Sequence, residues 1–140
     1  LSPNTPDLKE IGKAVEQAGA DAINMGNTHG PGMVINIETK TPLLSNKVGG
    51  VSGPAIKPIA VRCVYDLYNS VKIPLIGTGG ITTWRDGVEM MMAGATTLGI
   101  GSAIYYEGIE VFTKVSQGIS KFLEKEGYSN LKEIIGVAHE

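Results

Sequence analysis

Residues 73–101 read IPLIGTGGITTWRDGVEMMMAGATTLGIG, and the order of segments in this stretch decides the fold. An apolar run at 73–76 passes into glycines, and residues 83–86 then have the types found in a helix N-terminal capping box. The helix that follows ends at Gly94, and a second apolar run covers residues 97–100. Two apolar strands joined by one amphipathic helix predict a β–α–β unit with parallel strands.

The same order of segments occurs on both sides of this unit. Asn4 and Asp7 are the residue types that cap a helix and favour its positive end, and Gly19 predicts where that helix stops. The sequence Ala-Gly-Ala stands before a strand twice, at residues 18–20 and 93–95. Periodicity predicts these further segments: a strand at residues 22–25, a helix beginning at Pro54, a long helix over residues 109–122 and a short one over 130–133.

Continuously apolar strands that alternate with amphipathic helices indicate the α/β class, with a parallel sheet covered by helices. A closed (β/α)8 barrel takes about 250 residues, whereas this chain has 140 residues and about three complete strands. A small open sheet is the alternative. Residues 1–4 read as the end of a strand that enters its loop. We therefore expect residues 1–140 to be the C-terminal portion of a single (β/α)8 barrel domain, with the N-terminal half absent.

Residues 26–53 interrupt this pattern because they show no helical period. Two apolar segments, at 34–37 and 41–44, could pair as a small hairpin. A loop this long inside a compact α/β unit is more often functional than idle. It also follows a strand, and ligands of α/β proteins bind where strands pass into helices.

The candidate ligand residues lie at the strand-to-helix transitions, which a parallel sheet brings to one edge. Glycines there let backbone N–H groups approach a phosphate closely. The spacing matches neither the GxGxxG dinucleotide motif nor the GxxxxGK[ST] phosphate loop. Taken alone, Gly79-Gly80 is explained equally well as a turn. The four transitions are Ser2-Pro3-Asn4, residues 26–30, Gly77-Thr78-Gly79-Gly80 and Gly101-Ser102.

Several side chains near these transitions admit two interpretations. Asn27-Thr28 offers uncharged donors and acceptors suited to a planar amide or imide ring, although both residues also favour plain turns. His29 could carry a proton, but it has no visible carboxylate partner, and we expect an ordinary exposed side chain. Cys63 falls on the apolar face of a helix, which favours an inert core thiol over a nucleophile.

The segment before Pro54 is a further candidate for anion binding. Lys47 and Lys57 flank it and could each reach an anion, although exposed lysines are the usual case. Gly53, directly before the predicted helix start, is the better phosphate contact.

Composition excludes several classes of function. The net charge is −2, from 12 basic and 14 acidic residues without a basic stripe, so we expect no nucleic-acid partner. A lone cysteine excludes an internal disulfide framework and a multi-cysteine metal site, and it favours a reducing, cytoplasmic setting. No apolar stretch approaches the roughly 20 residues of a membrane span, and we expect no membrane association.

Five motifs in this order resemble the C-terminal half of class 1 dihydroorotate dehydrogenases, closest to the NAD-linked B-type catalytic subunit. They are Leu1-Ser2-Pro3-Asn4, Asn27-Thr28, GGVSGPAIKP at residues 49–58, GTGGI at 77–81 and Gly101-Ser102. The resemblance implies a (β/α)8 barrel that holds FMN at its C-terminal rim. It also implies oxidation of dihydroorotate to orotate in de novo pyrimidine biosynthesis.

The resemblance assigns roles to individual residues. Asn27 and Thr28 are expected to bind the pyrimidine substrate. Ser102 stands where many relatives have threonine, which preserves a hydroxyl, and the loop at residues 29–32 is one residue longer than usual. The residues expected to bind FMN are Gly26, beside the flavin ring, and Gly53, Gly79, Gly80, Gly101 and Ser102, around the ribityl phosphate.

The resemblance also implies what this chain lacks. The catalytic base, a cysteine in the B-type, and a flavin-contacting lysine belong upstream of Leu1, so no catalytic residue and no metal ligand is assigned here. We expect the fragment to be inactive alone. The parent enzyme is expected to be a homodimer paired with an FAD and iron–sulfur electron-transfer subunit. The alternatives are an FMN domain related to the pyrimidine-reducing domain of dihydropyrimidine dehydrogenase, or a non-catalytic phosphate-binding half-barrel.

Overall fold

A parallel sheet of three strands forms the centre of the computed structural model, which describes residues 1–139. The strands are β1 (Ile23–Met25), β6 (Leu75–Thr78) and β7 (Thr97–Gly99), in the order β1-β6-β7. Ile23 lies beside Leu75, and Ile76 lies beside Thr97. The α/β class and the parallel pairing predicted from residues 73–101 are therefore confirmed.

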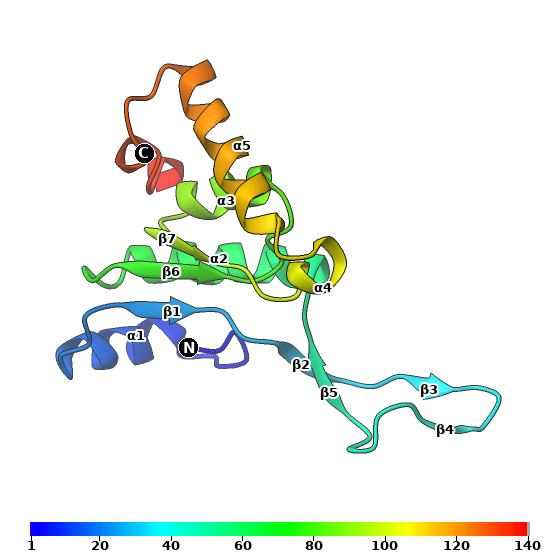
Figure 1. Ribbon diagram of the computed structural model, residues 1–140. Helices are drawn as coiled ribbons and strands as arrows, with labels where there is room; N and C mark the ends of the chain where they lie inside the picture. Colours follow the sequence, from blue (N-terminus) through cyan, green and yellow to red (C-terminus); the bar gives the residue numbers. More distant parts are fainter. Residues whose placement is uncertain (140) are drawn as a thin grey trace.

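Helices cover this sheet and pack on one another (Figure 1). Helix α2 contacts β1 and β6, α1 packs on α2, and α3 contacts β7 and carries α5 on its outer side. The helices are α1 (Leu8–Gln17), α2 (Lys57–Tyr68), α3 (Trp84–Met92), α4 (Ala103–Glu107) and α5 (Val111–Glu126). Three single turns of 3-10 helix complete the set: η1 (Pro54–Ile56), η2 (Leu131–Glu133) and η3 (Val137–His139).

Two apolar clusters hold these layers together. The first fills the space between the sheet and helices α1 and α2, where Met25, Cys63 and Leu67 are fully buried. The second lies between α3 and α5 and includes Val111 and the C-terminal Ile134. Burial of apolar area is the main driving force for folding, and these clusters position the ends of all three strands.

Two helix starts predicted from capping patterns have different outcomes. The capping box before α3 is confirmed, because the Thr83 hydroxyl accepts from the Asp86 N–H and the Asp86 carboxylate accepts from the Thr83 N–H. The predicted cap at Asn4 is wrong. Helix α1 begins at Leu8 with Asp7 as the N-cap residue and without a side-chain cap. Asn4 instead uses its side chain in a contact distant in sequence, which local pattern does not reveal.

Other predicted segments are confirmed with shifted ends. The helix expected from Pro54 starts as η1 and continues as α2, and the expected long helix is α5. The short terminal helix is η2, whose Asn130 and Glu133 form a capping box. Helix α4 was not expected, because five residues are too few to show a period.

Residues 26–53 form an antiparallel ribbon that projects away from the sheet (Figure 1). The predicted hairpin is present but short, with β3 (Ile35–Asn36) paired to β4 (Thr41–Pro42). Nearer the sheet, β2 (His29–Gly32) pairs with β5 (Gly49–Val51), a pairing that the sequence did not predict. These two strands read HGPG and GGV, and glycine and proline have low strand propensity. None of the helices within residues 1–139 has the length and apolar character needed to cross a membrane.

The close packing of α5 against Trp84, the first residue of α3, can be tested by mutation. A Cβ atom at Gly118 would overlap the Trp84 side chain. We expect Gly118→Val to lower the free energy of unfolding by about 1–3 kcal/mol, the usual cost of overpacking. Intrinsic helix propensity favours valine over glycine, so a loss would report packing. Urea denaturation measures it, with Gln117→Val as control, because Gln117 is the exposed neighbour. Equal unfolding midpoints would contradict this packing.

Candidate functional site

A cavity of about 210 Å³ lies beyond the carboxyl ends of the strands of the central sheet. Seven of the eight predicted site residues line it: Asn27, Thr28, Gly53, Gly79, Gly80, Gly101 and Ser102. They come from four segments: the loops after β1, β6 and β7, which the parallel sheet brings to one edge, and the Gly53 turn after β5, which belongs to the separate antiparallel pair. Three of the four predicted transitions therefore line one cavity, whereas Ser2-Pro3-Asn4 does not line it and reaches only the loop at Thr28 and Gly30 through Asn4. Whether the residues bind a ligand stays a prediction at this point.

The turn formed by Gly79 and Gly80 is required by the packing of the protein itself. Both residues have positive φ angles, 136° and 71°, which side chains rarely adopt. A Cβ atom at Gly79 would lie 2.7 Å from the Ala60 Cβ, and one at Gly80 would lie 2.9 Å from the Gly53 carbonyl oxygen. The sequence-level alternative of a plain turn thus explains why glycine stands here, even without a ligand.

Gly101 differs from that pair. A Cβ atom placed on it would have no neighbouring atom within 4 Å. Packing of this chain therefore gives no reason for a glycine at this position. The space in front of Gly101 belongs to the cavity, and a ligand that needs close approach to the backbone would explain the missing side chain.

Hydrogen bonds fix the loop that carries Asn27 and Thr28. The Asn27 Oδ1 accepts from the Thr28 N–H at 2.7 Å. The Asn4 amide spans the loop: its Nδ2 donates to the Thr28 carbonyl at 3.1 Å, and its Oδ1 accepts from the Gly30 N–H at 3.2 Å. Because the Asn27 oxygen is already used within the loop, this side chain has its NH2 group available to donate to a ligand.

Gly26 is the predicted site residue that does not line the cavity. A Cβ atom there would overlap the backbone of Thr78 at the end of β6. Close approach of β1 and β6 is therefore sufficient to explain this glycine. Its predicted contact with a flavin ring stays a prediction.

Lys57 does not supply positive charge to the cavity. Its Nζ donates to the Asp86 Oδ1 at 2.8 Å and to the Glu89 Oε2 at 2.6 Å. These two bonds raise the pKa of Lys57. Burial disfavours ionisation of Asp86, but hydrogen bonds from Lys57, Thr82 and Thr83 outweigh it and hold the pKa of that carboxyl well below its usual range. Lys57 is thus part of a fixed ion pair beside the cavity.

The remaining sequence candidates lie outside the cavity lining. Cys63 is fully buried in the first core cluster, and burial raises the pKa of its thiol, so the prediction of an inert core cysteine is confirmed. Lys47 is exposed in the ribbon. The expectation of an exposed His29 is wrong, because pairing of β2 with β5 half-buries it, and its Nδ1 has no hydrogen-bond partner among the described residues.

Four further residues line the cavity without having been given an individual role from the sequence, although the quoted motifs contain them: Ser52, Ile56, Thr78 and Ile81. Each is adjacent to a predicted glycine or one helical turn from it, but no chemical signature marks it. Within the described lining there is no Asp, Glu, Lys, Arg, His or Cys. Among residues 1–139 no group of three or more such acids, histidines or cysteines could hold a metal ion. The described part of the site can therefore bind through neutral dipoles, but it holds no group that titrates near neutral pH.

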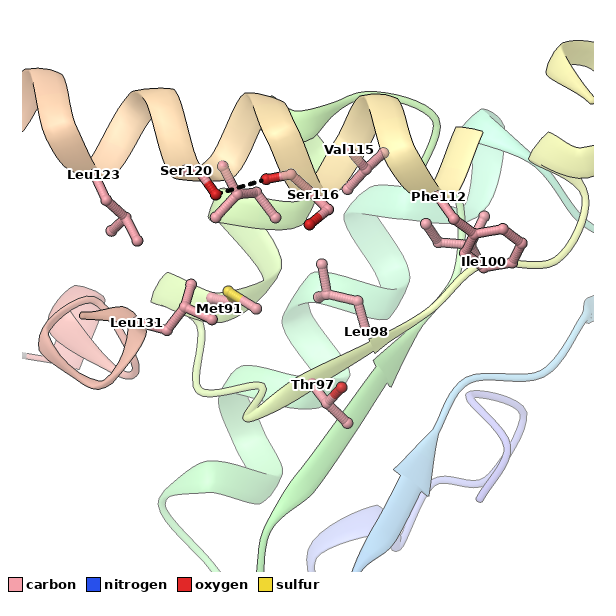
Figure 2. Close-up of a pocket in the computed structure, with 11 residues that line it drawn as sticks. Met91, Thr97, Leu98, Ile100, Phe112, Val115, Ser116, Ser120, Leu123 and Leu131 are labelled. Carbon is pink, nitrogen blue, oxygen red and sulfur yellow. Dashed lines mark hydrogen bonds between the residues drawn. The ribbon is translucent and has the colours of Figure 1, made fainter. Parts of the chain in front are cut away.

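A second cavity, of about 250 Å³, lies between α5 and the outer side of β7 (Figure 2). Figure 2 shows Leu98, Phe112 and Leu131 around it. Ser120 also lines it, but its hydroxyl donates to the Ser116 carbonyl within α5. This lining is largely apolar and uncharged, and it offers less for binding a polar ligand than the cavity at the strand ends does.

Comparison with known proteins identifies the family. The sequence model of a family described as dihydroorotate dehydrogenase matches residues 1–123. The catalytic subunit of dihydroorotate dehydrogenase B (NAD(+)) from Pyrococcus abyssi is 54% identical over 138 residues, which cover 99% of this chain and 46% of the relative. Its counterpart from Methanothermobacter thermautotrophicus is 51% identical over 140 residues, covering 100% and 46%. The chain spans about half the length of these curated relatives.

Solved structures agree with this result. DHODH from Eimeria tenella in complex with ferulenol superposes with a TM-score of 0.82 at 25% identity, covering 100% of this chain and 37% of that one. The ligand-free form gives the same TM-score and identity, with 39% of its chain covered. The sheet and its helices thus correspond to part of a (β/α)8 barrel, as predicted. The chain belongs to the dihydroorotate dehydrogenase family.

Proposed function

We propose that this chain is the C-terminal part of an FMN-dependent dihydroorotate dehydrogenase, which oxidises dihydroorotate to orotate in de novo pyrimidine biosynthesis. One observation carries the proposal: four loops distant in sequence meet at one cavity, and they hold seven of the eight residues assigned by resemblance. Membership of the family, through a match over residues 1–123, supports it further.

The cavity suits the phosphate end of FMN. Gly53, Gly79, Gly80 and Gly101 would approach the phosphate with backbone N–H groups, and the Ser102 hydroxyl would donate to it. The open space at Gly101 supports this fit, because residues 1–139 leave it unfilled. We propose Gly26 as a neighbour of the flavin ring. When bound, FMN supplies an acceptor for the hydride that leaves the substrate.

Asn27 and Thr28 are proposed to orient the pyrimidine. With its oxygen held by the Thr28 N–H, Asn27 offers its NH2 group to a carbonyl or carboxylate oxygen of the substrate. The bonds from Asn4 hold the loop in place, so that little conformational freedom is lost on binding. A substrate held in one orientation presents its reacting carbon atoms to the flavin and to the base, which lowers the barrier to the reaction.

The proton released in the oxidation needs an acceptor from another part of the full-length protein, because the described lining holds no group that titrates near neutral pH. We propose a cysteine base outside this chain, and this chain would then be inactive alone. The relatives are named as catalytic subunits of an NAD(+)-linked enzyme. We therefore propose that a homodimer works with an FAD and iron–sulfur electron-transfer subunit. A cytoplasmic location is proposed because Cys63 is a free thiol.

Substitution of Asn27 tests the assignment of substrate binding. In the full-length protein we expect Asn27→Ala to lower dihydroorotate turnover by about 10- to 100-fold. This corresponds to about 1.4–2.7 kcal/mol, the size expected for a lost hydrogen bond to the substrate. Bound FMN should be retained, and flavin absorbance measures it. Asn46→Ala, the same change at an exposed ribbon position, is the control. Normal turnover in Asn27→Ala would remove this residue from the site, and uracil reduction by the wild type would favour the dihydropyrimidine dehydrogenase alternative.

Substitution of Gly101 tests the assignment of FMN binding without disturbing the fold. Because a Cβ atom there meets no atom of residues 1–139, we expect Gly101→Val to fold normally yet to lose at least about tenfold in FMN affinity by blocking close approach. Thr113→Val, on the exposed side of α5, is the control. Flavin content and the thermal unfolding midpoint are measured together. Retained FMN would contradict the proposed phosphate site, and a flavin-free wild type would favour the non-catalytic half-barrel.

A further inference from the structure

Asp86 collects five hydrogen bonds beside the cavity. Its Oδ2 accepts from the backbone N–H groups and the hydroxyls of Thr82 and Thr83, at distances between 2.7 and 3.1 Å. Its Oδ1 accepts from the Lys57 Nζ at 2.8 Å. The Asp86 side chain is 13% exposed and that of Lys57 is 26% exposed. An ion pair shielded in this way, with every partner hydrogen-bonded, holds its geometry better than an exposed pair does.

This ion pair links two loops that line the cavity. Asp86 fixes Thr82 and Thr83, which follow the turn at Gly79 and Gly80 after one residue, Ile81. Lys57 is the first residue of α2 and follows Gly53 by one turn of η1. A Cβ atom at Gly80 would lie 2.7 Å from the Lys57 Cβ. The Lys57–Asp86 pair therefore joins the Gly53 side of the cavity to the Gly79-Gly80 side, across helices α2 and α3.

We propose that Lys57 and Asp86 are positioning residues for the phosphate group of FMN, a role that rests on the function proposed above. The pair does not touch the phosphate, because both charged groups face each other and neither residue lines the cavity. It sets the spacing between the backbone N–H groups of Gly53 and those of Gly79 and Gly80. Because the described lining has no cationic side chain, phosphate affinity depends on how well these N–H groups are held in advance.

Comparison of two flavins separates this role from a merely structural one. FMN and riboflavin share the ring and ribityl chain, but only FMN carries the phosphate. In the apo form of the full-length protein, we expect Lys57→Met to weaken FMN binding by about tenfold, the equivalent of one lost hydrogen bond to a charged group. Riboflavin affinity should stay within about twofold of the wild type. Quenching of flavin fluorescence on titration measures both dissociation constants.

Lys57→Met leaves the capping box of α3 intact, so it is the main variant and should fold normally. Three further variants complete the test. Asp86→Asn should reproduce the effect of Lys57→Met, and Lys57→Arg should restore most of the FMN affinity because the ion pair remains. Glu89→Gln is the matched control, since it removes the more exposed carboxylate that Lys57 contacts and leaves the bond to Asp86. Its ratio of FMN to riboflavin affinity should equal that of the wild type.

The outcomes distinguish this inference from the function on which it rests. If Lys57→Met binds both flavins as the wild type does, or weakens both equally, the pair has no specific role toward the phosphate and the inference is overturned. The proposed function survives that result as long as the wild type prefers FMN. A wild-type protein that binds FMN no better than riboflavin would contradict the proposed phosphate site itself, whatever the variants do.

Discussion

Parallel pairing of β1, β6 and β7 is the constraint on which the rest of this structure depends. In a parallel sheet every strand ends at the same edge, so the loops after the strands meet there even though long helices separate them in sequence. Register fixes this meeting in detail: Met25 lies beside Gly77, and Gly77 lies beside Leu98. The cavity, its glycines and the loop with Asn27 all depend on that alignment.

The glycines of the site divide into two groups that a sequence motif does not separate. At Gly80 the backbone conformation and the neighbouring Lys57 leave no room for a side chain. At Gly101 there is room, and the protein does not use it. A glycine of the first kind shapes the cavity whether or not a ligand binds. A glycine of the second kind is informative about a ligand, because the packing of residues 1–139 gives no reason for leaving the space open.

Charge is arranged beside the cavity and is absent from its described lining. Lys57 and Asp86 neutralise each other at the start of two helices, while the lining offers backbone groups, hydroxyls and one side-chain amide. Such a site binds an anion through dipoles that the fold has already oriented. Cys63, a reactive group that the sequence also offered, lies on the buried face of α2 in the apolar core, where burial raises the pKa of its thiol.

The sequence by itself determined the alternation of the three central strands with the helices α1, α2, α3 and α5, the α/β class and most of the residues at the cavity. Periodicity and capping patterns are local, and most of the glycine-rich transitions follow the central strands directly. The tertiary structure decided what depends on contacts between distant segments. It placed Asn4 on the loop at Thr28, paired β2 with β5, turned Lys57 toward Asp86 and separated Gly101 from the packed glycines. These outcomes depend on contacts between side chains that are distant in sequence, and local sequence patterns do not predict such contacts.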